Sequence, residues 1–382
     1  MSVWEKLVGQ EAVVAQLQRA AQKERPTHAW LFSGSAGAGR DTAALAFAAA
    51  LLCDNEGARG CGICKSCLTV LSGSHADLTH FRTQNLTIKI EEARELITKA
   101  QDRPSVGRWR VMIVEDANRM PERTSNVLLK AIEEPPPHTI WLLTAPSPSD
   151  VLVTIRSRCR PVTLRIPPVT AIADLLTNSY GVNSAEAEDV ARISQGNIDT
   201  ALRLSVSHDA ADARARRDFV VQIPLRLRTI STAMDAADKL MEHATNEAEA
   251  DASARNDAEL SALRQALGIA EGERVTPAMR SQVRQLEEDH KRRAKRIQTD
   301  TLDRFLVDLQ TFYRDVLTLQ LATGSQLVNA RFVPQLQQYA QQVAPERTMA
   351  HLELVSKTRR RITTNASAKL MLEALMTGLM NV

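Results

Sequence analysis

The chain has 382 residues, of which 44% are hydrophobic, 24% charged and 4% aromatic, and these values favour a soluble helical or α/β protein of two or three domains over a β-sandwich or a disordered chain. Its formal net charge of +3 comes from 48 basic and 45 acidic residues, a balance that excludes recognition of nucleic acid by overall charge. Because the sequence also lacks an apolar run of membrane-spanning length and an export signal at its start, we expect a cytoplasmic protein with no membrane contact.

Residues 1–166 alternate short apolar runs with amphipathic stretches, a pattern typical of βα units that build a mostly parallel sheet. The predicted strands are Ala29–Ser33, Ile88–Ile90, Arg110–Val114, Ile140–Thr144 and Val162–Ile166. The predicted helices are Gln10–Lys23, Asp41–Leu52, Ile90–Ala100 and Arg123–Glu133, the last of them stopped by three prolines at 135–137. We therefore predict an α/β domain with a nucleotide-binding type of layout.

The remaining residues are predicted to be helical. Residues 167–208 contain short helical segments and form a small second domain, and residues 209–382 form a third, all-helical domain. A charged tract at about 240–300 is interpreted as a helical hairpin broken near Gly268–Pro277. Three acids precede bases by four residues within it, at 287–291, 288–292 and 289–293, which favours a solvated helix over a partner or DNA contact.

A glycine-rich segment follows the first predicted strand. Gly34, Gly37 and Gly39 fit the spacing of a phosphate-binding loop, whose backbone N–H groups surround phosphate. However, Arg40 and Asp41 stand where such a loop has Lys and a hydroxyl residue. Asp41 removes a magnesium ligand and adds a negative charge, so ATP binding is doubtful. The alternative is a glycine turn that only caps a helix.

Four cysteines lie close together after the first βα unit. Cys53, Cys61, Cys64 and Cys67 have the spacing C-x7-C-x2-C-x2-C, which in a cytosolic chain indicates a tetrahedral Zn²⁺ site rather than disulfides. Four thiolates would leave no position for water, so the zinc would be structural, held by an insertion at 53–67. The alternative is four reduced cysteines in a flexible loop. A nucleic-acid module is disfavoured by the few cations and the lack of aromatic residues nearby.

Two carboxylates follow the predicted strand Arg110–Val114. In a working ATPase such a strand ends in Asp then Glu, of which one orients Mg²⁺ and the other polarises water. Here the order is Glu115 then Asp116, which displaces each carboxylate by about one methylene and disturbs this geometry. The alternative is that the two carboxylates are solvent-exposed residues at the end of a strand and have no catalytic role.

The segment Ser157-Arg158-Cys159, preceded by Glu133-Glu134 and two prolines, resembles the pattern of clamp-loader ATPase subunits of the AAA+ family. In that family the arginine acts in trans on the ATP site of a neighbouring subunit, and Arg158 matches it. The resemblance covers about the first 210 residues. It also implies a RecA-like domain, a small helical lid and a helical collar.

The loss of the chain's own ATP site together with a retained Arg158 resembles the delta-prime class of bacterial DNA polymerase III more than the gamma/tau motor class. Asp199 adds to this loss, since active members have an arginine there. The resemblance implies a non-hydrolysing subunit that joins gamma/tau-like motor subunits and a delta-like subunit in a hetero-pentamer, and loads a sliding clamp on primed DNA. The alternative is an active motor subunit.

Overall fold

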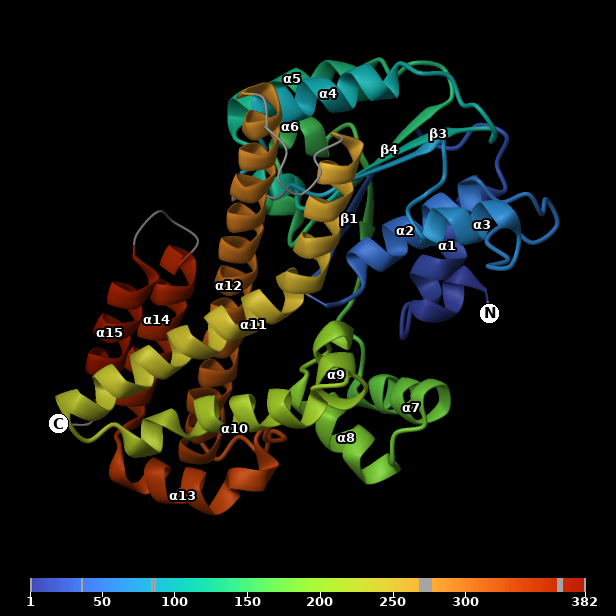
Figure 1. The fold of residues 1–382 in the computed structure, drawn as a ribbon. Helices are drawn as coiled ribbons and strands as arrows, with labels where there is room; N and C mark the ends of the chain where they lie inside the picture. The colour runs from blue at the N-terminus through green and yellow to red at the C-terminus, as the bar shows by residue number, and fades with distance from the viewer. Residues whose placement is uncertain are drawn as a thin grey trace. The chain divides into compact units, whose positions relative to one another are not determined.

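The computed structural model describes residues 2–35, 37–83, 85, 87–267, 277–362 and 367–380. The chain divides into two compact units, Met1–Ala210 and Ala211–Val382, and each is described by itself (Figure 1). None of the helices within these described residues combines the length and the hydropathy needed to cross a bilayer.

A five-stranded parallel sheet forms the centre of the first unit (Figure 1). Its strands are β1 (Ala29–Ser33), β2 (Leu78–Phe81), β3 (Arg110–Val114), β4 (Thr139–Ala145) and β5 (Arg160–Thr163), in the order β2-β3-β4-β1-β5. The three central strands β3, β4 and β1 are buried along their whole length, as their largely apolar sequences favour. Because all strands are parallel, their carboxyl ends meet at one edge, and the loops at that edge are brought together.

Helices cover both faces of this sheet. They are α1 (Glu11–Ala21), α2 (Arg40–Leu51), α3 (Lys65–Leu71), α4 (Ile90–Ala100), α5 (Glu122–Glu133) and α6 (Val153–Arg156), with short 3-10 turns η1 (Val3–Lys6), η2 (Ala117–Arg119) and η3 (Pro148–Asp150). Trp30 and Phe32 of β1 pack against Phe47 of α2 on one face. The alternate residue Leu31 lies in a second core with residues of α4 and α5.

The predicted α/β class is confirmed, while one predicted strand is wrong. Ile88–Ile90 is not a strand: Ile90 begins α4, and the edge strand is Leu78–Phe81. Ile88 is fully buried, its N–H donates to the carbonyl of Arg119, and its own carbonyl accepts from Thr124. Its apolar side chain therefore anchors a loop, and the β2 sequence Leu-Thr-His-Phe was too polar to be found by apolar runs.

Three short helices complete the first unit: α7 (Val169–Tyr180), α8 (Ser184–Ile193) and α9 (Ile198–Ser205). The turn between α8 and α9 depends on glycine, because Gly196 has φ of +85° and a Cβ there would lie 2.1 Å from Ile166. This turn holds α9 against the segment that leaves β5. The start of α9 is thereby fixed near the sheet edge.

The second unit is entirely helical in its described residues. It contains α11 (Ile230–Ala266), α12 (Pro277–Gln320), α13 (Val333–Gln342), α14 (Pro345–Ile362) and α15 (Ala368–Gly378), with most of α10 (Ala210–Arg226) and the turn η4 (Ala330–Phe332). Phe312, Tyr313 and Tyr339 stack edge to face in its core. The predicted helical C-terminal region is confirmed.

Helices α11 and α12 contain the charged tract at about 240–300. Its predicted break near Gly268–Pro277 lies outside the described residues except for Pro277, which begins α12. Here the predicted ion-pair register is wrong for two residues, since Arg292 pairs with Asp289 instead of Glu288. Arg293 bonds across to Glu259 and Asn256 of α11, each at 3.1 Å, instead of to its own helix. A register argument within one helix does not detect a partner on the antiparallel helix.

Candidate functional site

The glycine-rich segment forms a tight loop between β1 and α2, as its spacing predicts. Gly37 and Gly39 have φ of +75° and +87°, and Gly39 is the N-cap of α2. The residue between Ser35 and Gly37 lies outside the described residues. The strand–loop–helix frame of a phosphate-binding loop is therefore present, with Gly34 at its start.

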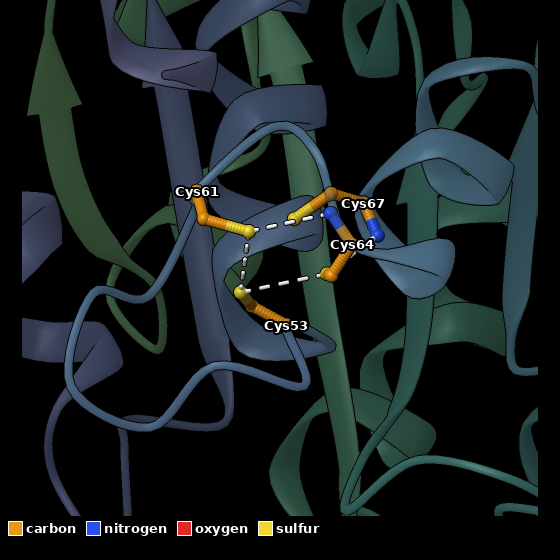
Figure 2. A group of neighbouring side chains, drawn as sticks. All are labelled: Cys53, Cys61, Cys64 and Cys67. Atoms are coloured by element: carbon orange, nitrogen blue, oxygen red, sulfur yellow. Dashed lines mark hydrogen bonds between the residues drawn. The ribbon is translucent and has the colours of Figure 1, made fainter. Parts of the chain in front are cut away.

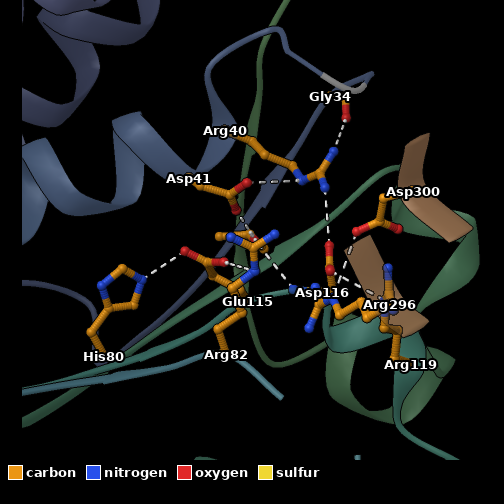
Figure 3. Close-up of polar contacts among 11 residues, drawn as sticks. Gly34, Arg40, Asp41, His80, Arg82, Glu115, Asp116, Arg119, Arg296 and Asp300 are labelled. Carbon is orange, nitrogen blue, oxygen red and sulfur yellow. Dashed lines mark hydrogen bonds and ion pairs between the residues drawn. The ribbon is translucent and has the colours of Figure 1, made fainter. Parts of the chain in front are cut away.

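Arg40 lies across this loop, and its charge is compensated from within the chain (Figure 3). Its guanidinium donates to the Gly34 carbonyl at 3.2 Å and to Asp116 at 3.0 Å, and lies 3.7 Å from Asp41. The Arg40 side chain is only 12% exposed. The cation that would contact a phosphate is thus already bound to Asp116, the carboxylate that follows β3.

Asp41 does not face solvent freely but bonds to the end of β4. Thr144 donates its hydroxyl hydrogen to Asp41 at 2.5 Å and accepts from the N–H of Asp116 at 3.3 Å. Burial raises the pKa of Asp41 above its ordinary value, and the nearby charge of Arg40 and the Thr144 bond oppose this shift. The hydroxyl of Thr144 therefore ties together the two acids at the sheet edge.

Glu115 is the second carboxylate at the end of β3, and it is also paired (Figure 3). One oxygen lies 2.7 Å from His80 Nε2, and the other lies 3.4 Å from Arg82 Nε. Asp116 has a left-handed backbone with φ of +52°, and its second oxygen lies 3.2 Å from Arg119. Neither carboxylate is free to hold a metal ion or to polarise water without losing a partner.

The start of α9 closes over the loop. The N–H of Ile198 donates to the Gly37 carbonyl at 3.1 Å, and a Cβ at Gly37 would lie 2.0 Å from the Asn197 side chain. Close by, partial desolvation raises the pKa of Asp199, while the charges of Arg40 and Arg82 lower it. The start of α9 thus lies against the loop, with Asn197 beside Gly37 and the carboxylate of Asp199 nearby.

The four cysteines come together at the other end of α2 (Figure 2). Their sulfur atoms all lie within 4.8 Å of one another, and Cys53 Sγ lies 3.7 Å from Cys61 and 3.8 Å from Cys64. Four sulfurs at about 2.3 Å from a tetrahedral metal would be about 3.8 Å apart, which fits this spacing. The cluster could therefore hold a metal ion with four thiolate ligands.

Local hydrogen bonds pre-form this cluster. The N–H groups of Cys64 and Cys67 donate to the sulfurs of Cys61 and Cys64, each at 3.4 Å. Backbone N–H donors lower the pKa of Cys61 to about 7, whereas burial raises the pKa of Cys67. Asp54 accepts from Ser66 at 2.7 Å and closes the loop between the first and the last cysteine.

The cysteine loop is also attached to the N-terminal segment. Trp4 Nε1 donates to the carbonyl of Arg59 at 3.1 Å, and the N–H of Val3 donates to that of Gly60. Cys53 and Cys67 are buried in the same core as β1 and α2. Loss of the cluster would therefore affect the packing of the whole sheet domain.

Arg158 lies away from this loop, after α6, and its side chain is 40% exposed. It forms an ion pair with Glu133, the last residue of α5, and donates to the carbonyl of Thr154 at 2.8 Å and to Ser157 at 3.2 Å. The structure thus places the chain's own loop and Arg158 in different environments. Arg40 is enclosed, and Arg158 is presented at the surface.

The sequence analysis did not predict the partners of these site residues, among them Thr144, His80, Arg82, Arg119 and Glu133. The sequence could have indicated Thr144, because it is a polar residue near the carboxyl end of the mostly apolar strand β4. His80 lies in the edge strand β2 and Arg82 directly follows it, whereas the sequence predicted a strand at Ile88–Ile90 instead. Glu133 was used only as part of a motif, without a partner.

Two family models match this chain. The model described as DNA polymerase III, delta subunit, matches residues 9–168, and the model described as DNA polymerase III, delta subunit, C terminal, matches residues 294–380. The first covers the sheet and its loops. The second covers most of α12 and the helices that follow it.

Curated relatives match about half of the chain. DNA polymerase III subunit tau/gamma of Haemophilus influenzae is 33% identical over 205 residues, 52% of this chain and 30% of that protein. Subunit delta' of Pseudomonas aeruginosa is 34% identical over 199 residues, 51% of this chain and 60% of that protein. The matched segment is therefore about a third of the length of the tau/gamma relative.

Among solved structures, a DNA polymerase III gamma subunit-related protein of Thermotoga maritima covers 95% of this chain and 97% of its own, with a TM-score of 0.44 and 14% identity. A match of this strength carries no functional argument. The fold and the site define a protein with the strand–loop–helix frame of nucleotide-binding domains and an internally paired loop. Over residues 9–168 and 294–380 the chain is similar to the DNA polymerase III delta-subunit models, and the curated relatives it matches are DNA polymerase III subunits.

Proposed function

We propose that this protein is a delta-prime-like clamp-loader subunit that does not hydrolyse ATP and instead supplies Arg158 to the ATP site of a neighbouring subunit. The contrast between two arginines carries the proposal. Arg40 is 12% exposed and bound to Asp116, whereas Arg158 is 40% exposed on the surface. An arginine that reaches a neighbour's phosphoryl group stabilises the charge that develops on it during transfer.

The proposed partners are gamma/tau-like motor subunits and a delta-like subunit, and through that complex a sliding clamp and primed DNA. In this proposal the protein works in the cytoplasm. Residues 1–166 form the AAA+ domain, residues 167–208 a lid, and residues 209–382 a collar that assembles the complex. The matches to tau/gamma and delta' subunits support this role in DNA polymerase III.

We further propose that the cysteine cluster holds one structural Zn²⁺. Zinc prefers four sulfur ligands in a tetrahedral arrangement, and the sulfur spacing fits it. All four ligand positions would come from this chain. The ion would then link the end of α2 to the start of α3.

The test is DNA-stimulated ATP hydrolysis by a complex reconstituted with cognate partners. Arg158→Ala is expected to lower kcat by about 10³-fold with assembly intact by light scattering, because a lost arginine finger has an effect of that order. Arg156→Ala is the matched control, since Arg156 is exposed two residues away and donates to the Pro148 carbonyl. Equal turnover by the native and Arg158→Ala complexes would refute the trans role.

A second candidate function is an active motor subunit. The observation that favours it is the similarity to tau/gamma subunits, which is as high as that to delta'. A motor must bind Mg·ATP by itself, so titration of the isolated chain with labelled nucleotide separates the two. Saturable binding in the micromolar range would support the motor, and its absence at millimolar nucleotide would support the delta-prime role.

A further inference from the structure

We propose that Glu133 is a positioning residue that orients Arg158 for the neighbouring subunit, an inference that rests on the function proposed above. Glu133 comes from the end of α5 and Arg158 from the turn after α6, and their side chains form an ion pair. Arg158 is thus held by a carboxylate from a different element of the same domain.

The position of Glu133 in its helix is unfavourable without such a partner. A carboxylate in the last turn of a helix lies at the negative end of the helix dipole, where cations are preferred. Glu133 and Glu134 both lie at this end of α5, and prolines at 135–137 prevent the helix from continuing. The guanidinium of Arg158 compensates the charge of Glu133 in this place.

Both partners are fixed by buried neighbours. Ile132, next to Glu133, and Ile155, three residues before Arg158, are fully buried in one core, and Cys159 after Arg158 is buried in it as well. The backbones that carry the two side chains are therefore held by the same packing. Such support is what keeps a long arginine side chain in one orientation.

The bonds to Arg158 leave one edge of its guanidinium available. Glu133 binds Nε, and the carbonyl of Thr154 and the hydroxyl of Ser157 accept from one terminal nitrogen. Among the described residues the other terminal nitrogen has no hydrogen-bond partner. A phosphate oxygen of a neighbouring subunit could accept from it while Glu133 stays in place, so the pair orients Arg158 and does not block it.

The test uses the reconstituted complex and the variant Glu133→Gln, with Glu134→Gln as the matched control of equal charge and adjacent position. An exposed ion pair contributes modestly, so we expect Glu133→Gln to lower kcat about three- to tenfold with KM for ATP unchanged. The control is expected to keep native turnover. In an Arg158→Ala background, Glu133→Gln is expected to cause no further loss, because it acts only through Arg158.

Three results would overturn the role of Glu133: unchanged or faster turnover in Glu133→Gln, an equal loss in Glu134→Gln, or a further loss in the Arg158→Ala background. Faster turnover would mean that Glu133 competes with phosphate for Arg158. Failure of this inference is separable from failure of the proposed function. If Arg158→Ala lowers turnover and Glu133→Gln does not, only the positioning role is lost.

Discussion

The two candidate sites of the sheet domain lie at the two ends of α2. They differ in whether the chain itself compensates the charges of the site. At its N-terminal end, Arg40 and Asp41 bond to Asp116 and Thr144, so the charges are compensated by the chain itself. At its C-terminal end, Cys53 begins a group of four thiols whose sulfurs are spaced for a metal ion. The charges at the N-terminal end are compensated without a ligand, whereas the cysteine cluster at the C-terminal end could hold one.

This difference indicates how a binding site can become structural. An arginine in place of lysine is long enough to reach the carboxylate of Asp116 after β3, and the two side chains form a largely buried ion pair at this loop. Thiols cannot compensate one another in this way, because four thiolates repel and four thiols form only weak hydrogen bonds. If the proposed zinc ion is bound, the cysteine end therefore depends on that ion for its stability.

The largest effect is expected at the cysteine end. Cys64→Ser keeps a capping oxygen at the N-cap of α3, where the Cys64 sulfur accepts from the Cys67 N–H. It removes one thiolate ligand, so metal content should fall from one zinc per chain to none. We expect the first unit to lose on the order of 5 kcal/mol or more of stability, because structural zinc contributes strongly to folding.

Metal analysis and thermal unfolding measure these two results. Cys159→Ala is the matched control, since this buried cysteine lies outside the cluster and its loss should leave the zinc content at one per chain. A Cys64→Ser protein with native zinc content, or one without zinc but with native stability, would contradict the dependence on an ion.

The sequence predicted much of this contrast because both sites are local in the chain. The glycine spacing fixed the loop between β1 and α2, and four cysteines within fifteen residues required proximity. The partners of Arg40 could not be predicted in the same way, since Asp116 lies 76 residues away and Thr144 lies 103 residues from Asp41. They meet only because parallel strands end at one edge, and the strand order is a property of the fold. His80 and Arg82 could not be predicted as partners of Glu115 either, because β2 was not predicted and its place beside β3 is a property of the fold.

An intermediate effect is expected at the loop end. Arg40→Ala leaves the carboxylates of Asp116 and Asp41 without their buried cation, and we expect a loss of about 2 kcal/mol in the free energy of unfolding, since Arg119 still pairs with Asp116. Urea denaturation measures it. Arg156→Ala, at an exposed site, should change stability by less than about 0.5 kcal/mol. If Arg40→Ala left the free energy of unfolding unchanged, the loop would not be stabilised by this ion pair.

The smallest effect is expected for Asp41→Asn, and it depends on pH. Burial raises the pKa of Asp41 in the folded state above the ordinary value of 3.8, so stability due to its neutral form is fully present below pH 3.8 and is lost as pH rises through the folded-state pKa. Asparagine is neutral at every pH and still accepts from Thr144. The variant should therefore be more stable than the native chain at pH 7, and this gain should shrink as pH falls towards 3.8.

Because the Asp41 side chain is 41% exposed, the gain should be below about 1 kcal/mol. Urea denaturation at pH 7 and at pH 4.5 measures it, with Asp174→Asn on the exposed side of α7 as a control. A variant that is less stable than the native chain at pH 7 would show that the attraction of Arg40 for the Asp41 carboxylate outweighs the cost of burying it. The charged form of Asp41 would then stabilise the loop. Arg40 would in that case be compensated by the carboxylates of both Asp41 and Asp116.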